Sequence, residues 1–104
     1  MQHADRKWTE IGPDVRVCAH TDGFDVRVQL PGTRWSNSLD LRRASLRVNQ
    51  REVSRSEVLG MDRIANGIRV QTAQGPLVLE LADADAGTVE RLVIALRDHA
   101  PDLW

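Results

Sequence analysis

Residues 15–30 read VRVCAHTDGFDVRVQL, two alternating runs on either side of an Asp-Gly pair. Every second residue is apolar, from Val15 in the first run and from Phe24 in the second. A period of two is typical of a strand that turns one face to a core and the other to solvent. Asp22-Gly23 predicts the connecting turn, because glycine adopts positive φ without steric cost. These residues therefore predict a half-buried antiparallel hairpin.

Shorter alternating runs follow this hairpin. Pro31-Gly32 ends the second strand, because proline cannot donate to a strand ladder. Residues 35–38 are typical of a loop or strand edge, and residues 64–72 are either one bulged strand or, as Asn66-Gly67 favours, a turn and a strand. The further strand candidates are Leu39–Leu41, Leu46–Val48, the mixed run Val53–Leu59, Ile68–Thr72 and Leu77–Ala82.

The apolar period changes from two to 3.6 after Ala82. Four apolar residues then follow the spacing i, i+3, i+4 and i+7, namely Val89, Leu92, Val93 and Leu96. This spacing predicts one amphipathic helix from about Asp85 to His99. Asp83 and Asp85 suit its N-terminal end, where carboxylates accept free backbone N–H groups. Pro101 predicts its end at or before the preceding residue.

The chain length and composition indicate one domain. The 104 residues are 41% hydrophobic and 28% charged, which is typical of a single globular unit. We expect residues 1–104 to form one mostly β (α+β) domain, with residues 1–12 as an N-terminal extension. The expected architecture is a six- to seven-stranded antiparallel small barrel or sandwich capped by one C-terminal amphipathic helix.

Several classes of protein are disfavoured by the same composition. A net charge of −1 provides no general attraction for nucleic acid. The single cysteine, Cys18, cannot form an intramolecular disulfide or a thiolate-rich metal site. No apolar run approaches the roughly 20 residues of a transmembrane segment, and the N-terminus does not resemble a signal peptide. We therefore expect a cytoplasmic protein without nucleic-acid partners.

Catalytic motifs are sparse. The chain has three histidines, widely spaced, and no nucleophile elbow, zinc-protease motif or phosphate loop. Cys18 and His20 share one strand face, as a nucleophile or metal pair requires. A packed cysteine beside a rim histidine is the simpler interpretation. We therefore expect no enzyme, no catalytic residue, no cofactor and no metal.

The order of strands followed by one helix resembles bacterial pleckstrin-homology-like domains. The residues that carry this resemblance are ASLRVNQREVSRSEVLG from Ala44 to Gly60, GIRVQT from Gly67 to Thr72, GPLVLEL from Gly75 to Leu81, and the final helix. The resemblance covers most of the chain. It implies a non-enzymatic binding or assembly module that engages a protein partner, a second copy or an anionic surface, and it names no ligand.

The N-terminal half is also similar to the opening strands of the α-crystallin domain of small heat-shock proteins. The similar residues are DVRV from Asp14, TDGFDVRVQLPG from Thr21 to Gly32, and the pairs of alternating residues at 39–41 and 46–48. The predicted helix departs from that family, in which further strands and a short apolar tail motif are expected. The alternative function is a chaperone-like domain that oligomerises and holds unfolded chains.

A basic stretch supplies the candidate binding residues. The segment from Arg34 to Arg55 contains six arginines and two acidic residues, Asp40 and Glu52, so its local net charge is +4. In a pleckstrin-homology-like domain these arginines would lie near one barrel mouth, where guanidinium groups hold phosphate or an acidic protein segment. The alternative is a solvated strand face whose arginines pair with acidic residues. The candidate binding residues are Arg34, Trp35, Arg42, Arg43, Arg47 and Arg51.

The three tryptophans are the remaining candidates for a contact surface. Trp8 and Trp104 lie near the chain ends, and Trp35 follows Pro31-Gly32. Tryptophan is enriched at interfaces, because it combines a large apolar ring with a polar N–H. We expect these side chains to dock on the domain's own surface. Trp35 is the best candidate to face a partner, because its loop adjoins the basic stretch.

Overall fold

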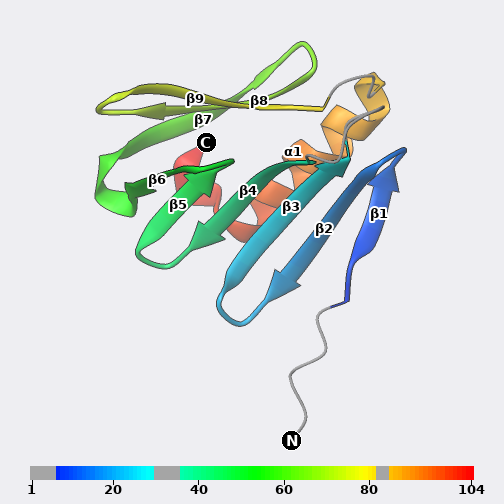
Figure 1. Ribbon diagram of the computed structural model, residues 1–104, viewed down its shortest axis with the longest axis horizontal. Helices are drawn as coiled ribbons and strands as arrows, with labels where there is room; N and C mark the ends of the chain where they lie inside the picture. The colour runs from blue at the N-terminus through cyan, green and yellow to red at the C-terminus, as the bar shows by residue number, and fades with distance from the viewer. Residues whose placement is uncertain (1–6, 30–35, 82–84) are drawn as a thin grey trace, which may run out of the picture.

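A computed structural model describes residues 7–29, 36–81 and 85–104. Within these ranges nine strands form two antiparallel sheets, followed by helix α1 (Ala86–His99) and a 3₁₀ turn, η2 (Pro101–Leu103) (Figure 1). The first sheet follows chain order: β1 (Thr9–Gly12), β2 (Val15–His20), β3 (Gly23–Gln29), β4 (Ser36–Arg42), β5 (Ser45–Val48) and β6 (Arg51–Ser54). The second contains β7 (Val58–Ile64), β8 (Gly67–Thr72) and β9 (Gly75–Glu80).

The hairpin expected at residues 15–30 is confirmed. β2 and β3 pair from Val15↔Val28 to His20↔Gly23, and Thr21-Asp22 forms the turn. Leu30, the last residue of the expected strand, lies outside the described residues. Gly23 is required, because a Cβ atom there would stand 1.8 Å from the backbone oxygen of Leu41 on β4. The glycine therefore lets β3 approach β4 closely at the turn end of the hairpin.

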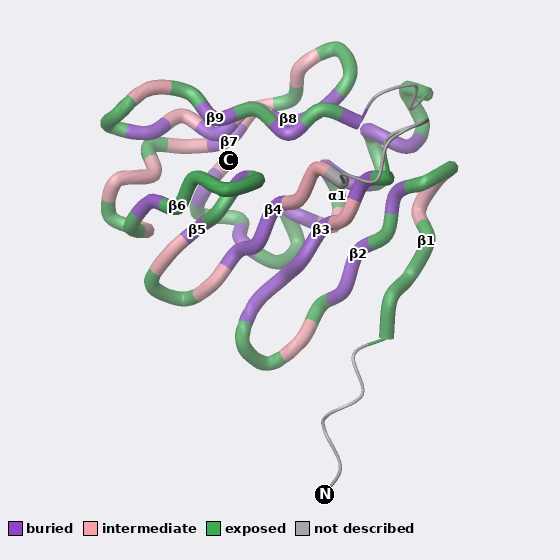
Figure 2. The backbone as a smooth tube through the Cα atoms, in the orientation of Figure 1, coloured by how far each residue is buried: buried purple, intermediate pink, exposed green. Residues whose placement is uncertain are grey.

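The core lies between the inner faces of the two sheets and one face of α1. Figure 2 shows buried residues alternating with exposed ones along β9, whereas β3 is buried over most of its length. The four apolar residues of the predicted helix stripe are all buried, namely Val89, Leu92, Val93 and Leu96. They join one cluster with residues of both sheets, among them Val26 and Val70. The helix thus covers apolar surface of each sheet.

Both predicted helix ends are confirmed. Asp85 caps the N-terminus, where its Oδ1 accepts a hydrogen bond of 2.7 Å from the backbone N–H of Thr88. The helix ends at His99, and Pro101 begins η2 two residues later. Asp83 lies outside the described residues. None of the helices in the described ranges has the length and apolar character needed to cross a membrane.

The mostly β class is confirmed, but the expected strand number and barrel are wrong. Residues 9–12, expected to be part of an extension, form β1 on the sheet edge. The mixed run 53–59 divides at the 3₁₀ turn η1 (Arg55–Glu57), which separates β6 from β7. Because this turn sends β7 into the second sheet, no ladder joins the two sheets in the described residues and no barrel closes. A hydrogen bond of 3.0 Å from Asn37 Nδ2 to the carbonyl of Glu80 connects β4 to β9 instead.

Candidate anion-binding site

A hollow of about 240 Å³ lies at the turn end of the β2–β3 hairpin. Four separate segments meet there: the turn after β2, the β4–β5 turn, η1 and the C-terminal end of α1. The residues that line it are Thr21, Asp22, Gly23, Arg42, Arg43, Arg55 and His99. Three guanidinium groups therefore surround one small hollow, although the basic stretch from which they come spans several strands.

Arg42 is held in place by the buried carboxylate of Asp25. Asp25 has no exposed side-chain surface, and its Oδ1 accepts a hydrogen bond of 2.5 Å from Arg42 Nη1. Its Oδ2 lies 3.0 Å from Nε2 of His20, which is itself nearly buried. Since Arg42 is about one third exposed, its guanidinium spans the distance from the buried carboxylate to the hollow. The ion pair therefore holds Arg42 in position there.

Asp25 was expected on a solvated strand face, and the structure buries it completely. Burial alone raises the pKa of a carboxylic acid, but the hydrogen bonds from Arg42 and His20 outweigh it and lower the pKa of Asp25. The pairing also raises the pKa of Arg42. Because Asp25 stands directly opposite Asp40 on the neighbouring strand, cationic side chains are needed to hold the two carboxylates together.

This ion pair predicts a pH dependence of stability. Because the pKa of folded Asp25 is below its ordinary value of 3.8, the unfolded chain binds more protons as the pH falls below that value. Stability from Asp25 is therefore fully present above about pH 4 and is lost as the pH falls through the lowered pKa. Urea unfolding between about pH 6 and pH 3 should show a steeper loss for the wild type than for Asp25→Asn.

The control for this comparison is Glu52→Gln, which removes an exposed carboxylate on β6. The prediction fails if the Asp25→Asn chain loses as much stability over this pH range as the wild type and the Glu52→Gln chain do.

Arg43 and Arg55 supply the other two guanidinium groups of the hollow. Arg55 Nη1 donates to the backbone oxygen of Arg42 at 2.8 Å, and its Nη2 lies 3.5 Å from the exposed carboxylate of Asp102. Arg43 is exposed, and within the described ranges it has no hydrogen-bond or ion-pair partner. Arg43 is therefore the unpaired guanidinium group at the hollow, whereas Arg42 and Arg55 are held in place by hydrogen bonds and ion pairs.

The structure brings together only part of the predicted binding set. Arg42 and Arg43 line the hollow, whereas Arg47 lies on β5 with Nη2 3.8 Å from Asp40. Arg51 is exposed on β6 and does not line the hollow. Arg34 and Trp35 lie outside the described residues. The alternative expectation, that the arginines pair with acidic residues, holds for Arg42 and Arg55. It holds for Arg47 at the longer distance of 3.8 Å.

Two residues of the hollow were absent from the predicted set. Arg55 belongs to the basic stretch, so its residue type could have marked it as a candidate binding residue. Its place at the hollow, however, depends on the η1 turn. His99 was interpreted only as a helix-end residue. Its ring lies 5.4 Å from that of Phe24 at an angle of 43°, a tilted contact that brings the end of α1 to the hairpin.

No family model, curated protein or solved structure matches this chain. The resemblances to pleckstrin-homology-like and α-crystallin domains therefore stay predictions.

Cys18 and His20 do not interact in the structure. Cys18 is buried, and His20 directs Nε2 to Asp25 and accepts a hydrogen bond of 3.2 Å at Nδ1 from the backbone N–H of Asp22. In the described part of the chain no group of three or more His, Cys, Asp or Glu side chains is arranged to hold a metal ion. The imidazole of His20 therefore forms hydrogen bonds with the buried carboxylate of Asp25 and with the backbone of the hairpin turn.

Trp8 and Trp104 both dock on the domain's own surface, as expected. Trp8 is 37% exposed and lies beside Arg16 and Arg27, whose guanidinium carbons are 5.8 and 5.6 Å from the ring centroid. This contact is a cation–π arrangement on the outer face of β2 and β3. Trp104 packs against the core cluster.

Proposed function

We propose that this chain is a non-enzymatic binding module that engages an anionic surface through the hollow at Arg42, Arg43 and Arg55. The observation that carries the proposal is the convergence of three guanidinium groups from separate segments on a hollow of about 240 Å³. Guanidinium forks match the geometry of phosphate oxygens, and each provides several donors at once. Among the described residues no hydrogen bond links the hydroxyl of Thr21 to Asp22 or His99, the other groups of the lining, so the hollow favours binding without reaction.

Charge rather than apolar insertion would provide the affinity. The exposed large apolar side chains of the described residues are Trp8, Leu59, Val78 and Ile94, and none of them lines this hollow. Binding to an anionic surface should therefore weaken steeply as the salt concentration rises, because exposed charges are screened. The resemblance to pleckstrin-homology-like domains supports the same class of function.

The first experiment is light scattering after size-exclusion chromatography, with and without vesicles that contain phosphatidylserine. We expect a small species that moves onto the vesicles at low salt. Replacing Arg43 and Arg55 by glutamine should weaken vesicle binding by about 30-fold, since each basic residue near an anionic surface contributes about 1 kcal/mol. Arg42 is left unchanged, because it holds Asp25.

A charge-matched variant provides the control. Replacing Arg47 and Arg51 by glutamine also removes two charges, but from positions outside the hollow, and should weaken binding far less. Equal losses in the two double variants would contradict a site at the hollow. A small species that ignores the vesicles would contradict the anionic surface and favour a protein partner. A large assembly would favour the α-crystallin-like alternative.

A further inference from the structure

The face of α1 that points away from the core carries a stripe of exposed residues. Ile94 lies at the centre of this stripe and is half exposed, although it is a large aliphatic residue. The outer helix stripe consists of Gly87, Glu90, Arg91, Ile94, Arg97 and Asp98, all of them exposed. Their spacing of three or four residues places them along one side of the helix. An apolar centre within a charged rim is the typical composition of a protein interface.

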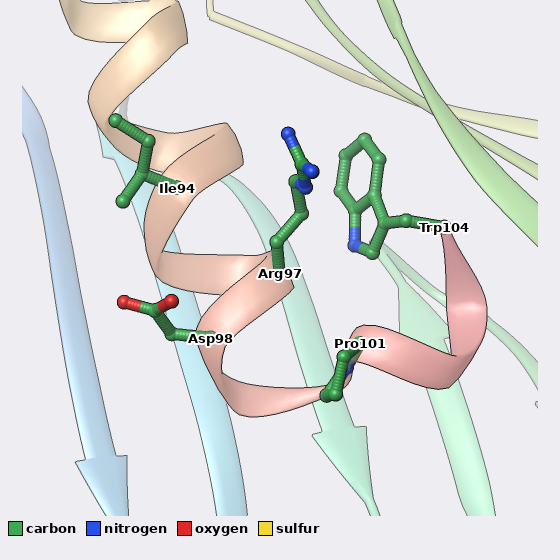
Figure 3. Close-up of a pocket in the computed structure, with 5 residues that line it drawn as sticks. All are labelled: Ile94, Arg97, Asp98, Pro101 and Trp104. Carbon is green, nitrogen blue, oxygen red and sulfur yellow. The ribbon is translucent and has the colours of Figure 1, made fainter.

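The four charges of the outer helix stripe form two pairs of opposite sign. Residues seven positions apart differ by only about 20° around a helix axis. Glu90 and Arg97 therefore share one side of the stripe, and Arg91 and Asp98 share the other. Figure 3 shows this division in the last turns of α1, where Asp98 lies on the side of Ile94 and Arg97 lies on the other side, beside the indole of Trp104. Each side thus carries one negative and one positive charge.

The charges in the first half of the stripe are held by their own chain, whereas those in the second half are not. Glu90 Oε1 accepts a hydrogen bond of 2.5 Å from Arg63 Nη1 on β7. Arg91 Nε donates a hydrogen bond of 2.6 Å to a backbone carbonyl of β1. Arg97 and Asp98 are exposed, and within the described ranges they have no hydrogen-bond or ion-pair partner. Two unpartnered charges therefore stand at one end of a stripe whose other end holds two fixed charges.

We propose that two copies of this chain pair through the outer helix stripe, with antiparallel α1 helices and a two-fold axis at Ile94. Glu90 lies four residues before Ile94 and Arg97 three residues after it. The axis therefore brings Glu90 of one copy to within about 1.5 Å, along the helix, of the level of Arg97 of the second copy. The same spacing sets Arg91 opposite Asp98 of the second copy. Each fixed charge then meets an unpartnered charge of opposite sign, around two Ile94 side chains that leave water.

The antiparallel arrangement is favoured over a parallel one by the helix dipoles and by the same charges. Antiparallel dipoles attract each other, whereas parallel dipoles repel. A parallel pair would set Glu90 opposite Arg91 of the second copy, although both already bind groups of their own chain. Gly87 has no side chain, so nothing bulky at the first turn of the stripe keeps a second helix away.

The contact is small, so the dimer should be weak. A contact made mainly by one helix from each copy is smaller than the interface of a permanent dimer, and we expect a Kd on the order of 100 µM. Sedimentation equilibrium of the full chain between about 10 µM and 1 mM covers this range. Raising the salt concentration should weaken the dimer, because its ion pairs are exposed at the rim. A chain that stays monomeric at about 1 mM would overturn the proposal.

The variant Arg97→Glu tests the ion pairs. It sets two carboxylates against each other at both symmetry-related contacts, so the Kd should rise at least tenfold. The fold should be unchanged in circular dichroism, because Arg97 has no partner in the described part of its own chain. The matched control is Arg51→Glu, the same charge change at an exposed residue of β6, which should keep the wild-type Kd. Equal weakening by both variants would assign the effect to net charge and contradict pairing through the stripe.

A mixture of two variants tests which residues face each other. Glu90→Lys gives up only an exposed ion pair with Arg63 within its own chain, and it should also weaken the dimer, because two cations then stand opposite. Mixing the Glu90→Lys chain with the Arg97→Glu chain restores opposite charges at both contacts, so a heterodimer with nearly the wild-type Kd should form. In a parallel pair the same mixture would keep two like-charge contacts. Failure of the mixture to recover the dimer would therefore overturn the antiparallel pairing.

Discussion

Replacing Arg42 with methionine is expected to lower the free energy of unfolding by about 3 kcal/mol, because it leaves a buried carboxylate without its cation. Asp25 has no exposed side-chain surface and accepts a hydrogen bond of 2.5 Å from Arg42. His20 stays within 3.0 Å and retains part of the pairing, so the loss should lie at the lower end of what a broken buried ion pair costs. Urea unfolding of the two chains at neutral pH measures the difference.

Arg47→Met is the matched control for this experiment. Arg47 lies on the adjacent strand β5, is about half exposed and is 3.8 Å from the carboxylate of Asp40, so its removal should cost less than about 1 kcal/mol. Similar losses in both variants would show that Asp25 does not depend on Arg42. Replacing the pair together, Asp25→Leu with Arg42→Met, should recover much of the lost stability, because no charge then stays buried.

The burial of Asp25 could not be predicted from the alternating pattern of its strand. Alternation from Val15 to Val28 correctly predicted the hairpin, because the period of two and the Asp-Gly turn are local properties. The same alternation placed Asp25 on a solvated face. Its burial depends on side chains from the two neighbouring strands, namely Arg42 on β4 and His20 on β2, which both reach Asp25 from the register position of Gly23. A strand register across a turn of unknown length cannot be read from one strand alone.

For the candidate site, too, the sequence predicted the residue types but not which of them lie together in the fold. Residue type marked the basic stretch, and Arg42 and Arg43 do lie in the hollow. Arg47 and Arg51 face elsewhere, because successive strands of a meander carry them away from the hairpin turn. His99 enters from the far end of the chain, and only the packing of α1 against the first sheet brings it there. The apolar stripe of the helix predicted that α1 packs on a sheet, but not how the helix is oriented on it.

Replacing Leu96 with alanine is expected to destabilise the whole domain by about 2–5 kcal/mol, the usual range for a buried leucine. Leu96 is completely buried in the cluster that contains residues of both sheets. No strand ladder joins those sheets in the described residues, so they are held together by side-chain packing, to which the helix core contributes. Hydrogen exchange of the backbone amides of Val26 on β3 and Val70 on β8 measures the loss of protection in each sheet.

If the chain is one cooperative domain, the two amides should lose protection by the same factor, because both then exchange through global unfolding. Ile94→Ala is the control, since Ile94 lies on the same helix but is half exposed, and its effect should stay within about 0.5 kcal/mol. Loss of protection at Val70 with Val26 unchanged would contradict a single unit. The second sheet would then open independently, and the helix would belong energetically to the first sheet, whose hairpin and arginines form the proposed binding site.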